Sequence, residues 1–219
     1  MRKLIGGIEA GGTKFVCGVG VAGSSQLLER AEFNTTNRPE EVLSQSAAWL
    51  TKQASEHGEL RALGIASFGP VNLNTESDSY GYITSTPKTG WKDTDVVGFF
   101  RSTLPDAPVV FDTDVNGAAL GESRYGAAKN LADFVYVTMG TGIGAGGMSG
   151  GSLLHGLVHP EMGHLLLPRI AGDDFKGICA YHNDCWEGLC SGPAIEKRTG
   201  VSPSRLPSGS PAWEYVVRY

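Results

Sequence analysis

The sequence predicts an α/β fold built from two related halves. Its 219 residues open with three segments of strand pattern, the first two joined through a Gly-rich turn. Alternating helix and strand patterns follow, and a second strand, Gly-rich turn and strand then repeats the opening unit. A chain of this length can form one large domain or two small ones and can bury a core without disulfides.

Each element follows from the spacing of apolar residues, which alternate in strands and recur every three or four residues in helices. Pro39 opens the clearest helix and Gly58 follows its end. We expect strands at 4–8, 15–21, 26–33, 61–67, 108–111 and 134–139, helices at 39–57, 95–104, 115–125 and from 193, a long loop at 72–91, a second Gly-rich hairpin at 140–151, a linker at 202–211 and the start of a helix pattern at 212–219.

Composition and charge exclude several classes of protein. The chain holds 18 Lys and Arg against 23 Asp and Glu, a formal net charge of -5, which argues against nucleic acid or an anionic membrane as partner. No run of 18 apolar residues is present, and Glu9 interrupts the first apolar stretch before a signal peptide could form. The expected location is the cytoplasm.

Two Gly-rich turns are candidate phosphate sites, because glycines let backbone N–H groups approach an anion closely. Taken alone, either turn is equally an ordinary structural hairpin, and neither matches a Walker A loop or a dinucleotide fingerprint. Together they suit a nucleotide whose phosphates lie between two domains. The candidate residues are Gly11, Gly12, Thr13 and Lys14 in the first turn and Gly140, Thr141, Gly142 and Gly144 in the second.

A pair of carboxylates, Asp112 and Asp114, stands at the end of a predicted strand, where ligand crevices form in α/β sheets. The alternative is a helix cap for the segment that follows. Beside two phosphate turns, a carboxylate here suits a base that accepts a hydroxyl proton during phosphoryl transfer.

The spacing H-x14-C-x2-H-x2-C predicts a metal site on His164, Cys179, His182 and Cys185. Two thiolates and two imidazoles suit tetrahedral zinc, and four protein ligands make such a site structural. The alternatives are a Cys179–Cys185 disulfide, which a cytoplasmic location disfavours, and four unrelated residues.

Two glutamates flank these ligands, Glu161 before His164 and Glu187 after Cys185. A metal-stapled loop could use them to orient sugar hydroxyls, whereas the alternative is that both are surface residues. The nearby His155 and His159 are expected to be loop residues without a ligand role.

Four segments then resemble one family in the same order: G-I-E-A-G-G-T-K at 7–14, T-D-V-N-G-A-A-L-G-E at 113–122, T-M-G-T-G-I-G-A-G at 138–146 and H-P-E-M-G-H at 159–164. Together they resemble the ROK family of bacterial sugar kinases. Through residues 81–91 and the form of its zinc loop, the chain is most similar to the zinc-containing fructokinases.

The resemblance implies an actin-like, ribonuclease-H-like fold of two domains, with ATP, Mg²⁺ and sugar in the cleft between them. We expect an N-terminal domain at 1–117 and a partial C-terminal domain at 118–219 that carries the zinc loop 164–187. In the family pattern Asp114 is the catalytic base and the two Gly-rich turns hold phosphates. The positions that match sugar-binding residues are Gly69, Thr86, Asp114, Glu161, His164 and Glu187.

The expected activity is therefore transfer of phosphate from ATP to a hexose. The expected substrate is D-fructose, phosphorylated at its 6-hydroxyl. Mannose, glucose and an N-acetylhexosamine are alternative substrates, and a sugar sensor or an inactive fragment are alternative functions. Glu9 stands where many relatives carry Asp, a change that affects how metal-bound water is held. Thr113 stands where glucokinase-like relatives carry Asn, and the loss of that amide argues against glucose-type recognition. A homodimer is possible.

The chain ends before the family's third Gly-rich segment, which is expected to contact adenosine. We therefore expect a partial chain that exposes apolar strands such as residues 134–139.

Overall fold

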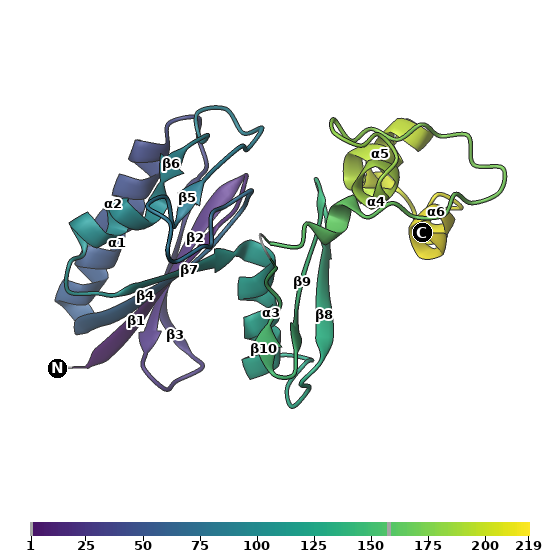
Figure 1. The fold of residues 1–219 in the computed structure, drawn as a ribbon. Coiled ribbons are helices and arrows are strands. Elements are labelled where there is room, and N and C mark those ends of the chain that lie inside the picture. Colours follow the sequence, from purple (N-terminus) through teal and green to yellow (C-terminus); the bar gives the residue numbers. More distant parts are fainter. Residues whose placement is uncertain (1, 157–158) are drawn as a thin grey trace.

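The computed structural model describes residues 2–156 and 159–219, and its first half is a mixed five-stranded sheet (Figure 1). The strand order is β3-β2-β1-β4-β7. The first three strands pair antiparallel, whereas β4 lies parallel to both β1 and β7. The strands are β1 (Lys3–Ala10), β2 (Lys14–Val21), β3 (Leu27–Asn34), β4 (Glu59–Ser67) and β7 (Val109–Thr113).

Helices α1 (Pro39–His57) and α2 (Val96–Thr103) cover one face of this sheet, as Figure 1 shows. Every second residue of β1 is buried, so the apolar side chains of one strand face meet the helices. Phe15, Leu50, Leu63, Trp91 and Phe100 are fully buried in the resulting core. Between α1 and α2, β5 (Tyr82–Ile83) and β6 (Thr94–Asp95) form a small antiparallel pair.

The second half begins with α3 (Asp114–Tyr125), which follows β7 directly and lies between the two sheets (Figure 1). On the side of α3 away from the first sheet lies a three-stranded sheet of order β10-β9-β8. It is built from β8 (Phe134–Met139), β9 (Ile143–Ser149) and β10 (Ser152–Leu153). A Cβ on Gly146 would lie 2.6 Å from the backbone carbon of Val115. The glycines of β9 therefore let α3 approach the sheet closely.

Short helices make up the C-terminal part of the chain. In chain order these are the 3₁₀ turn η1 (Met162–His164), α4 (Trp186–Cys190), α5 (Gly192–Thr199), the 3₁₀ turn η2 (Pro203–Arg205) and α6 (Trp213–Arg218).

Most of the expected elements are confirmed, and helix 39–57 and strand 134–139 have the predicted ends. The sequence analysis missed α4, which has only five residues, and η2, which lies inside the expected linker. The expected division at residue 117 stays a prediction, and α3 runs across it.

Strand β8 leaves apolar side chains in solvent, as expected for residues 134–139. Val135, Val137 and Met139 are exposed. Along β8 they alternate with Tyr136 and Thr138, which are the partners of Gly146 and Gly144 on β9. Because those glycines face α3, the exposed side chains lie on the opposite face of the sheet.

Within the described residues, no helix combines the length and the apolar character needed to cross a membrane.

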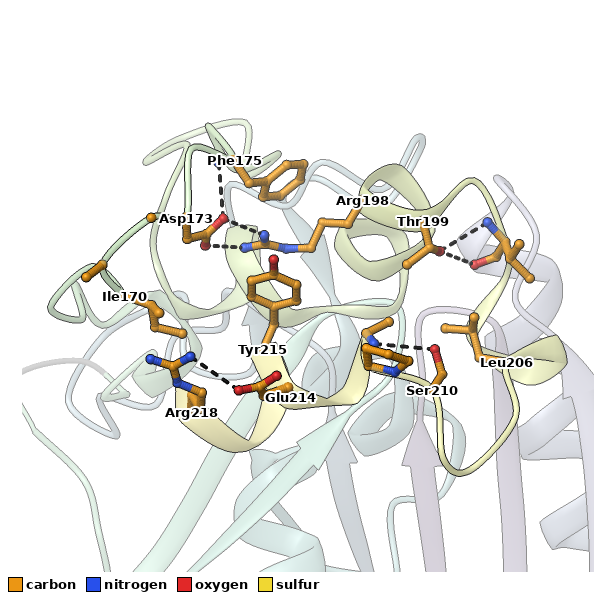
Figure 2. Close-up of a pocket in the computed structure, with 15 residues that line it drawn as sticks. Ile170, Asp173, Phe175, Arg198, Thr199, Leu206, Ser210, Glu214, Tyr215 and Arg218 are labelled. Atoms are coloured by element: carbon orange, nitrogen blue, oxygen red, sulfur yellow. Dashed lines mark hydrogen bonds and ion pairs between the residues drawn. The ribbon is translucent and has the colours of Figure 1, made fainter.

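A buried arginine joins the loop that precedes α4 to helices α5 and α6 (Figure 2). The guanidinium of Arg198 pairs with both carboxylate oxygens of Asp173, at 2.8 and 2.9 Å, and lies over the rings of Phe175 and Tyr215. Tyr219 donates a further hydrogen bond to Asp173 at 2.7 Å. The Arg198 guanidinium holds the pKa of the Asp173 carboxyl well below its usual range.

We expect Asp173→Asn to lower the free energy of unfolding by about 3–5 kcal/mol, because it leaves the guanidinium of Arg198 buried without its counter-charge. The two side chains are only 6% and 3% exposed, so water cannot replace the lost partner. Denaturant unfolding at pH 7 measures the change. Asp174→Asn, at the exposed neighbouring position, is the matched control. Equal stability of the two variants would contradict the prediction.

Candidate active site and metal centre

Asp114 is held at the junction of β7 and α3. Thr113 caps the helix, its side-chain oxygen accepting a hydrogen bond from the Asn116 amide at 3.2 Å. Oδ1 of Asp114 accepts from the amide of Val115 at 2.9 Å. These local bonds fix the carboxylate at the carboxyl end of a parallel strand, the edge at which the sequence analysis expected a site.

The surroundings of Asp114 favour its protonated form. Burial, with a contribution from the negative charges of Glu9 and Glu161, raises the pKa of Asp114 to about 6. A carboxylate with a pKa near neutrality is well matched to accept a proton from an alcohol and release it to solvent.

Two neighbouring cavities meet at Glu161 and His159. The smaller, of about 70 Å³, also includes Gly69, Asp114 and Gly144, so four of the predicted site residues line one cavity. The larger, of about 1050 Å³, extends along residues 70–75 and 84–85.

Thr86 lies outside both sets of lining residues, and its hydroxyl oxygen accepts a hydrogen bond from the Lys88 amide at 3.3 Å.

The first Gly-rich turn is a tight connection between β1 and β2. The amide of Gly11 donates to the carbonyl of Lys14 at 3.0 Å, and the carbonyl of Gly11 accepts from the Thr35 hydroxyl at 2.8 Å. A Cβ on Gly12 would have no neighbour within 4 Å, so this side of the turn is open. Lys14 pairs with Glu32 at 2.8 Å on the neighbouring strand β3.

The glycines of the second turn have different surroundings. A Cβ on Gly140 would meet nothing within 4 Å, whereas one on Gly144 would lie 2.9 Å from the Val115 side chain. The carbonyl of Gly140 accepts from the amide of Gly192, the first residue of α5, at 2.7 Å. A cavity of about 440 Å³ lies beside Gly140 and Thr141 and is also lined by α5 and Trp213.

Glu187 contacts the second turn and is not among the residues that line the two cavities that meet at Glu161. Its Oε2 accepts a hydrogen bond from the amide of Ile143 at 2.9 Å. A Cβ on Gly142 would lie 2.5 Å from the same oxygen, so the absence of a side chain there makes room for the carboxylate.

The four predicted metal ligands come together at the start of α4. The donor atoms of His164, Cys179, His182 and Cys185 all lie within 4.8 Å of one another. Nδ1 of His164 is 3.4 Å from the Cys185 sulfur, and all four cysteines of the chain are free, which excludes the alternative disulfide. Two sulfurs and two imidazole nitrogens at this spacing fit the donor set and size of a tetrahedral zinc ion.

Two histidines that the sequence analysis treated as loop residues lie at the site. His155 pairs with Asp112 at 2.8 Å, and His159 is buried against the loop that follows β4. Their partners are 43 and 88 residues away in the sequence, so no local spacing could have identified them.

Comparison with known proteins gives a consistent result. The model of the ROK family matches residues 5–210. A fructokinase from Pediococcus pentosaceus is 44% identical over 216 residues, which span 99% of this chain and 72% of that protein.

Solved structures agree with this comparison. The ROK hexokinase of Thermus thermophilus has a TM-score of 0.78 at 27% identity and covers 98% of this chain and 72% of its own. A ROK family glucokinase from Streptomyces griseus, in complex with glucose and AMPPNP, has a TM-score of 0.67 at 26% identity over 92% of this chain and 62% of its own. The two-domain, actin-like fold class and the resemblance found in the sequence are confirmed, and the chain belongs to the ROK family.

Proposed function

We propose that this chain phosphorylates D-fructose with ATP, giving ADP and fructose 6-phosphate. The observation that carries the proposal is the shared cavity of Asp114 and Glu161 at the junction of the two halves. A pKa of about 6 suits Asp114 to take up a proton there. The 44% identity to a fructokinase supports the choice of sugar.

Asp114 acts as the base for the attacking hydroxyl. As the sugar oxygen bonds to the γ-phosphorus, the bond from that phosphorus to the β-γ bridging oxygen breaks and ADP leaves. The hydroxyl proton passes to the carboxylate of Asp114. No covalent intermediate on the protein is needed, so catalysis depends on positioning and electrostatic stabilisation.

The open sides of Gly12 and Gly140 support phosphate contacts at the two turns. Helix α5 starts within hydrogen-bonding distance of Gly140, and its amino end adds partial positive charge there. The cavity lined by α5 and Trp213 is where we place the rest of the nucleotide. Thr13, Lys14, Thr141 and Gly142 complete the proposed phosphate contacts.

Glu9 would hold Mg²⁺ through its water shell, since it is the next-to-last residue of β1, close to the first turn, and its charge acts on Asp114. When bound, Mg²⁺ offsets the negative charge of the transferred phosphoryl group. Glu161, His164 and Glu187 would orient the sugar hydroxyls, together with Gly69 and Thr86 on the neighbouring loops.

Zinc would have a structural role, because four protein ligands leave no position for a reacting water. Cys185 is the residue before α4, and α4 carries Glu187. The zinc loop therefore sets the position of one proposed sugar-orienting carboxylate.

A hexose panel tests the proposed activity. We expect a coupled ADP-release assay to give the highest kcat/KM with D-fructose, and lower values with mannose, glucose and N-acetylglucosamine. Formation of fructose 6-phosphate identifies the hydroxyl that reacts. A clear preference for glucose, or no turnover with any hexose at saturating ATP, would contradict the proposal.

Phosphoryl transfer should depend on ionised Asp114. With its pKa near 6, kcat/KM for the sugar should fall about tenfold per pH unit below pH 6, and Asp114→Asn should lower kcat by about 10²–10⁴. The raised pKa means that the ionised carboxylate destabilises the folded state above pH 6. Asp114→Asn removes that charge, so it should not lower the melting temperature at pH 7.5. Asp106→Asn, at an exposed loop position, is the control. A variant with near-normal turnover would leave Asp114 with only a structural role at the first turn of α3.

One zinc per chain should be found by metal analysis of protein purified without added metal. We expect Cys185→Ser to lose the metal and to raise KM for the sugar more than KM for ATP, since α4 then loses its anchor. Cys17→Ala removes a buried thiol of the first sheet and should keep the zinc. Metal-free protein with an intact melting temperature would contradict the site.

A further inference from the structure

One imidazole links the two halves of the chain on the sugar side of Asp114. His159 is 9% exposed, and its ring lines both the small cavity that contains Asp114 and the larger cavity beside it. Glu161, two residues later, lines the same two cavities. The ring is packed close to Gly69, where an added Cβ would lie 3.4 Å from Nε2.

Each ring nitrogen of His159 faces a different partner. Nε2 accepts a hydrogen bond from the backbone amide of Val71 at 3.3 Å. Nδ1 lies 3.4 Å from Oε1 of Glu161. Because a backbone amide can only donate, Nε2 carries no proton, and the neutral ring must carry its proton on Nδ1, toward the carboxylate.

Glu161 combines a constrained backbone with a side chain that is free to turn, so a hydrogen-bond donor is needed to fix its carboxylate. Its backbone is left-handed, with φ 49° and ψ 45°. Residues other than glycine rarely adopt this conformation, and they do so where surrounding contacts stabilise it. Its side chain is 46% exposed, so the carboxylate can turn in solvent. Because Nδ1 of His159 is 3.4 Å from Oε1, a small turn of the exposed carboxylate would complete a hydrogen bond to it and reduce that freedom at low entropic cost when the sugar binds.

We propose that His159 is a positioning residue for sugar binding. Its Nδ1–H orients the carboxylate of Glu161, and its Nε2 ties that orientation to the loop of residues 69–72 in the first half of the chain. The inference rests on the proposed function, in which Glu161 contacts the sugar. His159 does not touch the reacting atoms, so its whole effect passes through Glu161.

Three substitutions separate the two ring contacts. His159→Asn keeps an N–H donor at the position of Nδ1, His159→Gln places an acceptor near Nε2, and His159→Leu removes both. We expect KM for D-fructose to rise about tenfold in the Leu and Gln variants and about threefold or less in the Asn variant, with KM for ATP unchanged. His57→Leu, at the end of α1, is the control and should leave both constants unchanged. A lower kcat and melting temperature at unchanged sugar KM would show only support of the loop and would overturn the proposal.

A double-mutant cycle tests whether the effect passes through Glu161. In a Glu161→Gln background, His159→Leu should raise the sugar KM no further, because the carboxylate that it orients is already gone. Full additivity of the two substitutions would contradict the proposal.

The tautomer can be tested without turnover. Nitrogen NMR of the protein free of sugar and nucleotide should show His159 protonated at Nδ1 and bare at Nε2. The opposite tautomer would overturn the proposal. A wild-type protein that phosphorylates no hexose but shows the expected tautomer would refute the proposed function and not the geometry, so the two failures can be told apart.

Discussion

The close packing of α3 on the glycines of β9 sets the position of the whole site. A Cβ on Gly146 would lie 2.6 Å from both the backbone carbon of Val115 and Oδ1 of Asn116. A side chain there would push away the first turn of α3, and Asp114 would move with it. Because α3 also follows β7 without a connecting loop, one rigid helix joins the two sheets and presents its first residue at their junction. Displacements of about 1 Å in such a group are enough to impair transfer between bound reactants.

The electrostatics of the junction follow from that placement. Glu9 lies near the end of β1 in the first sheet and Glu161 belongs to the second half, yet the charges of both act on Asp114 at the start of the connecting helix. Burial and repulsion raise the pKa of Asp114, so the free protein carries an unfavourable charge at neutral pH. In the proposed reaction, taking a proton from the sugar hydroxyl would relieve this unfavourable charge, and a divalent cation near Glu9 would reduce the repulsion further. The same arrangement that destabilises the fold slightly would therefore favour the proposed proton transfer.

Sequence reasoning succeeded where the information was local. Helix 39–57 and strand 134–139 carry an uninterrupted period, and the clustered residues Cys179, His182 and Cys185 lie within seven residues of one another. It failed at α4, whose five residues are too few to show a helical period. It also could not foresee the direction of Glu187, because the amide that holds its carboxylate is 44 residues away in the sequence. His159 was overlooked for the same reason, since Val71 is brought to it only by the fold.

The second Gly-rich segment shows why a glycine motif has no single meaning. Gly140 has open space where a ligand could approach, Gly142 makes room for the carboxylate of Glu187, and Gly144 admits the side chain of Val115. Along a few residues the absence of side chains thus serves the proposed phosphate site, helix α4 beside the proposed zinc site, and the helix of the proposed base in turn. Gly140 and Gly142 lie in the turn that precedes β9, and Gly144 is the second residue of that strand. The missing side chains of this turn therefore bring the open side of Gly140, the carboxylate of Glu187 and the first turn of α3 together at one end of β9.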